Sequence, residues 1–160
     1  FESYLEKSYC KTASLIANSS KAIGVLSDVD QDRLESLYFF GKQLGLAFQV
    51  VDDILDFTGN DEQLGKPAAS DLQSGYLTAP VFYALEENPT LSELINGKFL
   101  KKDDLDTALS IVRDSSAIQK SRELAEKFAS ESKDSISWLP DSPSKKALLE
   151  LPEFVISRLY

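Results

Sequence analysis

Three aspartates stand inside a stretch of the chain that is otherwise apolar. Residues 47–57 read AFQVVDDILDF, which places Asp52, Asp53 and Asp56 among valines, an isoleucine and a leucine. A carboxylate in such surroundings is costly unless a cation meets it. On a helix of about 3.6 residues per turn, Gln49 and the three aspartates fall within an arc of roughly 100°. Because apolar residues fill the rest of the circumference, we expect this acidic strip to line a cavity.

The ligand types in this strip indicate which cation it binds. The chain holds no His and one Cys, Cys10, so the donors available to the strip are oxygens. Carboxylate oxygens suit a hard divalent ion, and Mg²⁺ is the natural candidate because it also keeps waters and takes phosphate oxygens. We interpret the strip as half of a metal site that a phosphorylated ligand completes. The alternative is a solvated acidic face, but the apolar flanks and Gly45 on the same side favour metal binding.

The loop that follows the acidic helix supplies a cation. Lys66 stands between Gly65 and Pro67, about ten residues after Asp56, so a short loop can fold it back over the helix end. Beside a magnesium site, such a lysine acts as a point charge for phosphate oxygens. By itself, Lys66 fits equally well a surface position in a turn. Asp71 either caps the next helix or holds Lys66 in place.

A second cation precedes the acidic helix in the sequence. Lys11 and Thr12 offer one ammonium group and one hydroxyl on a predicted helix. Both groups suit the oxygens of a phosphate. Without further context, a solvated lysine at the edge of an amphipathic helix explains the pair equally well.

The elements that position these groups are all predicted to be helices. Apolar residues recur every three or four positions, and no segment alternates with period two for long enough to indicate a strand. Asp30 can cap the longest helix, and Gly75 and Pro80 are expected to weaken or bend a later one. We therefore predict an all-α fold. Its helices cover residues 4–23, 30–57, 72–85, 90–95, 102–112, 117–138 and 144–159, with a loop at 58–70.

Composition excludes several classes of function. The net charge of −9 argues against nucleic-acid binding, and no apolar run approaches the ~20 residues of a membrane span. The absence of His excludes a Ser-His-Asp triad and His-ligated zinc within these residues. One Cys excludes an internal disulfide and indicates a reducing compartment. Since the chain opens on Phe1 and contains no Met, we expect it to be part of a longer protein.

Three segments in this order resemble the second half of trans-isoprenyl diphosphate synthases, the polyprenyl synthetase family. They are KSYCKTASLIANSSKA (7–22), GLAFQVVDDILDFTG (45–59) and LGKPAASDLQSGYLTAPVFYALE (64–86). The middle segment is the most specific, because it joins Phe-Gln to the second aspartate-rich DDxxD box at a fixed spacing. The resemblance covers essentially the whole chain, and the segments look most like the long-chain enzymes of cyanobacteria and plastids, of the solanesyl diphosphate synthase kind.

The resemblance implies a fold and a reaction. Residues 1–160 would form the C-terminal part of an isoprenoid-synthase helical bundle. The enzymes of this family join isopentenyl diphosphate to an allylic diphosphate, which loses its diphosphate with the help of Mg²⁺. Asp52, Asp53 and Asp56 match the second box. Positions that hold the allylic diphosphate and steady the developing charge correspond to Lys11, Thr12, Gln49 and Lys66, and Phe48 matches an aromatic substrate-binding residue whose ring face favours a cation.

Other expectations follow from the same resemblance. The first aspartate-rich box and the isopentenyl-binding residues would precede Phe1, so we expect the 160-residue piece alone to be inactive. Product length in this family is set mainly near the first box, which would also precede Phe1. We expect a homodimer in a plastid, or in the cytoplasm of a cyanobacterium.

Two other functions fit parts of the sequence. A non-catalytic regulatory subunit of a heteromeric synthase keeps the fold but loses acidic boxes, so the intact Asp52, Asp53, Asp56 and Lys66 oppose it. A terpene cyclase shares the metal chemistry, but the Phe-Gln pair and the loop around Lys66 favour chain elongation.

Overall fold

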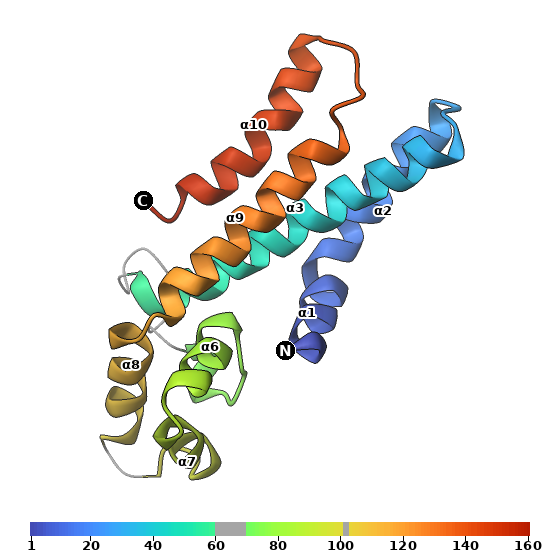
Figure 1. The fold of residues 1–160 in the computed structure, drawn as a ribbon. Coiled ribbons are helices and arrows are strands. Elements are labelled where there is room, and N and C mark those ends of the chain that lie inside the picture. The colour runs from blue at the N-terminus through green and yellow to red at the C-terminus, as the bar shows by residue number, and fades with distance from the viewer. Residues whose placement is uncertain (60–69, 101–102) are drawn as a thin grey trace. The chain divides into compact units, whose positions relative to one another are not determined.

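The computed structural model describes residues 1–59, 70–100 and 103–160, and within these ranges it contains helices and turns but no strand (Figure 1). The all-α prediction is therefore confirmed. The helical elements are α1 (Glu2–Ser8), η1 (Tyr9–Ala13), α2 (Ser14–Leu26), α3 (Gln31–Thr58), α5 (Ser70–Gln73), α6 (Ala79–Glu87), α7 (Thr90–Asn96), α8 (Asp104–Asp114), α9 (Ala117–Ser135) and α10 (Pro143–Ser157).

The chain divides into two compact units, which we describe separately. Unit 1 consists of Phe1 and Asp52–Glu123, and unit 2 consists of Glu2–Val51 and Leu124–Tyr160. Both α3 and α9 contribute residues to each unit. No helix in the described ranges is long and apolar enough to cross a membrane.

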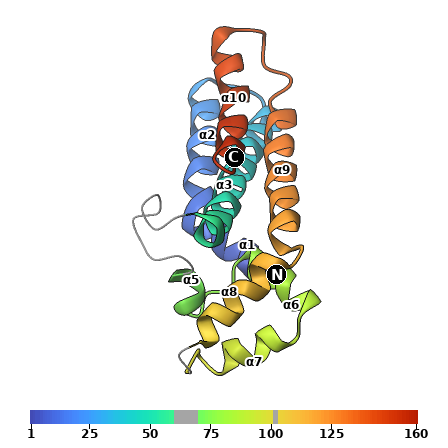
Figure 2. The same ribbon diagram turned by 90° about the vertical axis from the view of Figure 1, so that its left-hand side faces the viewer.

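In unit 2, α3 lies between α2 and α9 (Figure 2). Lys21 on α2 forms a salt bridge with Glu35 on α3, with 2.6 Å between Nζ and Oε1. From the other side, the Ser132 hydroxyl of α9 donates to the Phe40 carbonyl of α3 at 3.0 Å. The backbone N–H of Arg33 donates to the Asp30 carboxylate at 2.9 Å, so Asp30 caps α3 as predicted.

Two glycines set how closely α2 and η1 approach α3. An ideal Cβ on Gly41 would lie 2.6 Å from the carbonyl oxygen of Ile16, and one on Gly45 would collide with Cα of Ala13. Neither position has room for a side chain, because the obstacle in both cases is backbone. The spacing of four residues puts both glycines on one face of α3. The result is a backbone-to-backbone contact that any larger residue would force apart.

Unit 1 has its own apolar core. Phe57 at the end of α3 is fully buried together with residues of α5, α6, α7, α8 and α9, namely Leu72, Val81, Ala84, Leu91, Ala108, Val112 and Ala117. The burial of Phe57 anchors the C-terminal end of α3 in this core. Asp56, its neighbour, is thereby brought to the core's edge.

The predicted helix 72–85 is wrong in its extent. The structure has two helices here, α5 and α6, separated by a turn in which Gly75 has φ +80°. Pro80 does not bend a helix but occupies the first turn of α6, where a missing N–H costs nothing. The sequence pattern merged the two because the apolar spacing continues across the turn.

The other predicted helices agree with the structure to within a few residues, with one internal difference. The predicted helix 4–23 contains a π-helical turn, η1, in which the N–H of Ser14 donates to the carbonyl of Tyr9. This wider turn separates α1 from α2 and contains Lys11 and Thr12.

We expect Gly41→Ala to destabilise the complete protein by about 1–3 kcal/mol, because the new Cβ collides with backbone that cannot rotate away. Urea unfolding measures this. Gly97→Ala is the control, since its Cβ would come no closer than 3.2 Å to the Glu93 carbonyl. Equal stability of Gly41→Ala and the unmodified protein would contradict the close contact.

Stability at acid pH should depend on Glu87. Its carboxylate accepts from the Lys120 ammonium at 2.8 Å and from the Ser116 side chain and backbone, which lowers its pKa from 4.5 to about 2. A lowered pKa contributes stability above pH 4.5, and that contribution is lost as the pH falls through about 2. Glu87→Gln should therefore lower the melting temperature at pH 7, and the difference from the unmodified protein should shrink between pH 4.5 and pH 2. A difference that is constant over this range would contradict the assignment.

Candidate functional site

Thr12 and Gln49 are joined side chain to side chain in unit 2. The Thr12 hydroxyl donates to Oε1 of Gln49 at 2.7 Å, and Gln49 is 5% exposed. Because the amide oxygen accepts this bond, the orientation of the amide is fixed, with its nitrogen directed away from Thr12. The structure thus brings together two of the residues that the sequence predicted for one site.

The π-helical turn η1 holds Thr12 in this position. Ala13 in this turn is fully buried against Gly45 of α3, while Lys11 is exposed. Wide turns of this kind are frequent at functional sites, since they change the direction of the side chains they carry. Here the turn leaves Lys11 accessible and Thr12 in contact with α3.

The three aspartates of the predicted strip differ in exposure. Asp53 and Asp56 are 3% and 1% exposed, whereas Asp52 is exposed. Two of the three aspartates are therefore shielded from solvent, whereas the cavity that the sequence predicts along the whole strip stays a prediction.

Asp56 accepts hydrogen bonds from the segment that begins α5. The Ser70 hydroxyl and the backbone N–H of Asp71 donate to its two carboxylate oxygens, each at 3.3 Å. Asp71 was predicted either to cap the following helix or to hold Lys66. Asp71 lies within the first turn of α5 rather than at its N-cap, and its backbone N–H donates to Asp56. Lys66 lies outside the described residues.

The acidic residues offer ligands for a metal without enclosing one. In the described part of the chain, no group of three or more His, Cys, Asp or Glu converges as a metal site. Asp53 and Asp56 supply hard oxygen donors and are nearly buried, which fits Mg²⁺ in chemistry. As a donor set they are incomplete and need oxygens from another source.

The sequence did not reveal the residue that fixes the end of α3. Nε of Arg113 on α8 donates to the carbonyl of Phe57 at 2.9 Å. This carbonyl is among the last in α3, which have no partner within the helix, so the guanidinium satisfies it and complements the helix dipole. Arg113 and Phe57 are 56 residues apart, and no local signal could have linked them.

Phe48 already has a cation on its ring. The guanidinium carbon of Arg158 lies 4.9 Å from the ring centroid. The sequence predicted Phe48 as a substrate-binding residue with a ring face toward a cation of the substrate. One face of the Phe48 ring is therefore covered by Arg158, a cation of the protein itself.

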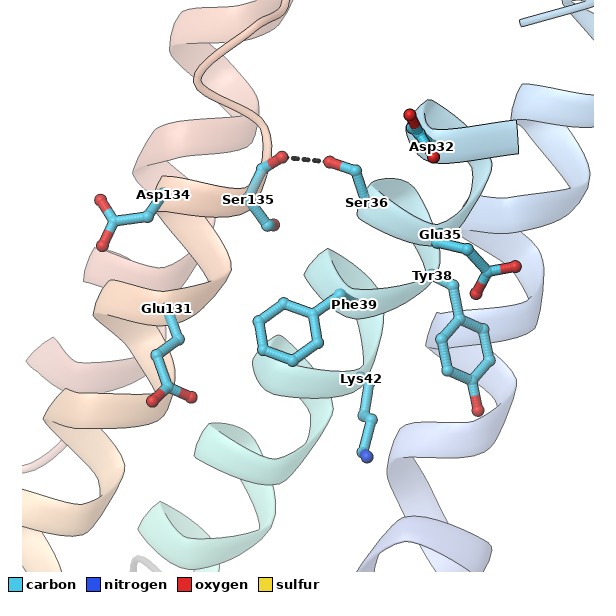
Figure 3. Close-up of a pocket in the computed structure, with 9 residues that line it drawn as sticks. All are labelled: Asp32, Glu35, Ser36, Tyr38, Phe39, Lys42, Glu131, Asp134 and Ser135. Atoms are coloured by element: carbon cyan, nitrogen blue, oxygen red, sulfur yellow. Dashed lines mark hydrogen bonds between the residues drawn. The ribbon is translucent and has the colours of Figure 1, made fainter. Parts of the chain in front are cut away.

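A surface groove of about 710 Å³ lies elsewhere in unit 2, between the first half of α3 and the end of α9 (Figure 3). It contains none of the residues predicted for the site. Four of its residues are acidic, which disfavours a phosphorylated ligand. Lining residues are Asp32, Glu35, Ser36, Tyr38, Phe39, Lys42, Glu131, Asp134 and Ser135.

The comparisons with known proteins agree on one family. The model of the family described as "Polyprenyl synthetase" matches residues 1–112. A prenyl transferase of Synechocystis sp. is 54% identical over 99% of this chain and 49% of its own length. Chloroplastic solanesyl diphosphate synthase 2 of Arabidopsis thaliana is 47% identical over 99% of this chain and 38% of its own length.

A solved structure agrees with the sequence comparisons. The polyprenyl synthase of Caulobacter crescentus, in complex with calcium and isoprenyl diphosphate, superposes with a TM-score of 0.86 at 34% identity. The match covers 98% of this chain and 49% of that chain. The chain thus spans about half the length, or less, of the proteins it matches.

We expect Thr12→Val to destabilise the complete protein by about 1–3 kcal/mol, because the buried Gln49 oxygen loses its donor while the side-chain volume is kept. Urea unfolding is the measurement. Thr12→Ser is the matched control, since it retains the hydroxyl and should be much closer to the unmodified protein. If the Val and Ser variants are equally stable, the bond contributes nothing.

Proposed function

The chain belongs to the polyprenyl synthetase family, and from this premise we propose that the complete protein is a Mg²⁺-dependent prenyltransferase. It condenses isopentenyl diphosphate with an allylic diphosphate to make a polyprenyl diphosphate. The observation that carries the proposal is α3 itself, a single helix with Gln49, bonded to Thr12, and the nearly buried Asp53 and Asp56.

Lys11, Thr12 and Gln49 bind the allylic diphosphate. Lys11 supplies an exposed cation, and the Thr12 bond orients the Gln49 amide so that its nitrogen can donate to a diphosphate oxygen. Lys66 adds a second cation. These groups hold the leaving group in place while the carbon–oxygen bond breaks.

Asp52, Asp53 and Asp56 would hold Mg²⁺, which would offer its remaining positions to oxygens of the substrate. Bound Mg²⁺ stabilises the negative charge of the departing diphosphate. The complex of the Caulobacter relative with calcium and isoprenyl diphosphate supports this pairing of a divalent ion with a prenyl diphosphate. The incomplete donor set of this chain is consistent with it, because the substrate supplies the remaining oxygens.

The reaction needs no general base from an imidazole. The allylic carbon–oxygen bond breaks, the double bond of isopentenyl diphosphate forms a new carbon–carbon bond, and the released diphosphate takes up the proton that leaves. Because the main barrier is charge separation, holding and neutralising the leaving diphosphate is the main task of the protein. The residues assigned above do this with ammonium, hydroxyl, amide and carboxylate groups, and the chain has no His.

The relatives support a product class and a location. The similarity to a chloroplastic solanesyl diphosphate synthase supports a long-chain product and a plastid, and the similarity to the Synechocystis protein supports the cytoplasm of a cyanobacterium as the alternative. The complete protein is a homodimer in this proposal. The 160-residue piece is inactive alone, because the first aspartate-rich box and the isopentenyl site belong to the other half. A non-catalytic regulatory subunit is disfavoured, since it has no need of two nearly buried aspartates.

To test the proposal, the complete protein is incubated with labelled isopentenyl diphosphate and several allylic primers, with and without Mg²⁺, and the products are sized. We expect elongation that requires Mg²⁺, and a loss of about a hundredfold in kcat for Asp53→Asn, which keeps the shape but removes the charge. Asp32→Asn is the control, because Asp32 is an exposed carboxylate on the same helix.

The control should elongate at the unmodified rate. No elongation with any primer would refute the prenyltransferase proposal. Elongation at full rate by Asp53→Asn would remove the metal-binding role of that residue and leave the rest standing.

A further inference from the structure

The C-terminal end of the chain is docked by contacts both before and after Arg158. Leu159 is 8% exposed, and the hydroxyl of Tyr160 donates to Glu126 on α9 at 3.4 Å. Earlier in α10, Glu153 forms a salt bridge with Lys133 on α9, with 3.2 Å between Oε1 and Nζ. These contacts dock the C-terminal end of the chain on α9, and the Arg158 side chain extends from the docked segment.

From this position Arg158 reaches α3. Its guanidinium carbon lies 4.9 Å from the centroid of the Phe48 ring. A planar guanidinium stacks on an aromatic face more favourably than an ammonium does, since it adds surface contact to the electrostatic attraction. Arg158 also follows the last turn of α10, where any cation favours the helix dipole. The helix dipole accounts for a positive charge at position 158. It does not account for the contact of that charge with the Phe48 ring.

Phe48 directly precedes Gln49, whose amide is bonded to Thr12. Successive residues of a helix project about 100° apart. Contacts at Phe48 and at Gln49 therefore hold α3 from two directions, one from α10 and one from η1. Both contacts restrict the rotation of α3 about its axis, in addition to the close backbone contacts at Gly41 and Gly45, and so restrict the direction of the Gln49 amide.

We propose that Arg158 is a positioning residue for the diphosphate-binding site, which acts by stacking on Phe48 and so fixing α3 and Gln49. The proposal rests on the proposed function for the identity of the ligand. In it, Arg158 does not touch the substrate. Its effect on binding therefore requires the Phe48 ring.

A double-mutant cycle on the complete protein tests this. The probe is inorganic pyrophosphate in the presence of Mg²⁺, and its dissociation constant is measured by calorimetry for four proteins: the unmodified one, Arg158→Gln, Phe48→Leu and the double variant. We expect Arg158→Gln to weaken pyrophosphate binding about fivefold, the factor that corresponds to one cation–π contact. In the Phe48→Leu background the same substitution should have no effect.

A matched pair elsewhere in unit 2 provides the control. The guanidinium carbon of Arg33 lies 4.9 Å from the ring centroid of Trp138, the same distance as in the Arg158–Phe48 pair. Arg33→Gln removes a cation–π contact of the same length, together with the exposed salt bridge of Arg33 to Asp30, without touching Phe48 or Gln49. It should lower stability by a similar amount and leave the pyrophosphate affinity unchanged.

Three results would overturn the proposal. An equal loss of affinity from Arg158→Gln with and without Phe48 would mean that Arg158 binds the anion directly. Unchanged affinity in Arg158→Gln would mean that the stack is structural only, and an equal loss in Arg33→Gln would mean a general effect of lost stability. Because the titration needs no turnover, it decides the role of Arg158 even if the protein elongates no primer and the proposed function fails.

Discussion

The contact between Gly45 of α3 and Ala13 of η1 is the constraint on which the site depends. With no side chain on Gly45, the two backbones approach closely enough for Ala13 to be fully buried. Thr12, the preceding residue, then lies within hydrogen-bond distance of Gln49, one turn further along α3. A larger residue at position 45 would separate the two helices and break this bond. Gly45 therefore matters because it lets the two backbones approach closely enough for the Thr12–Gln49 bond, and not because it makes the backbone of α3 flexible.

Both ends of the site helix are held by charged groups, one adjacent in the sequence and one far away. Arg113 satisfies the Phe57 carbonyl at the C-terminal end of α3, and Asp30 caps its start. Between them, Asp56 accepts two hydrogen bonds from the beginning of α5. These contacts restrict movement of a helix that carries several carboxylates, whose mutual repulsion would otherwise favour its unwinding.

Much of this arrangement was predictable from the sequence, but its contacts were not. The helical period identified α3 and placed Gln49 and the aspartates on one of its faces, because a mostly buried helix leaves a clear apolar pattern. The division between α5 and α6 was missed, since Pro80 begins a helix as readily as it bends one. The stack of Arg158 on Phe48 depends on how α10 docks, and it joins residues 110 positions apart, beyond the reach of any local pattern.

The π-helical turn η1 changes the spacing of the buried residues in the first helical segment. The buried residues Tyr4, Ser8, Ala13 and Ala17 follow one another at steps of four, five and four. The step of five falls at η1, where the extra residue is accommodated without losing the common inner side. A deletion of one residue there would restore an ordinary helix but swing α1 by about 100° against α2. Natural length variation should accordingly avoid these five positions, even where the side chains themselves are replaced.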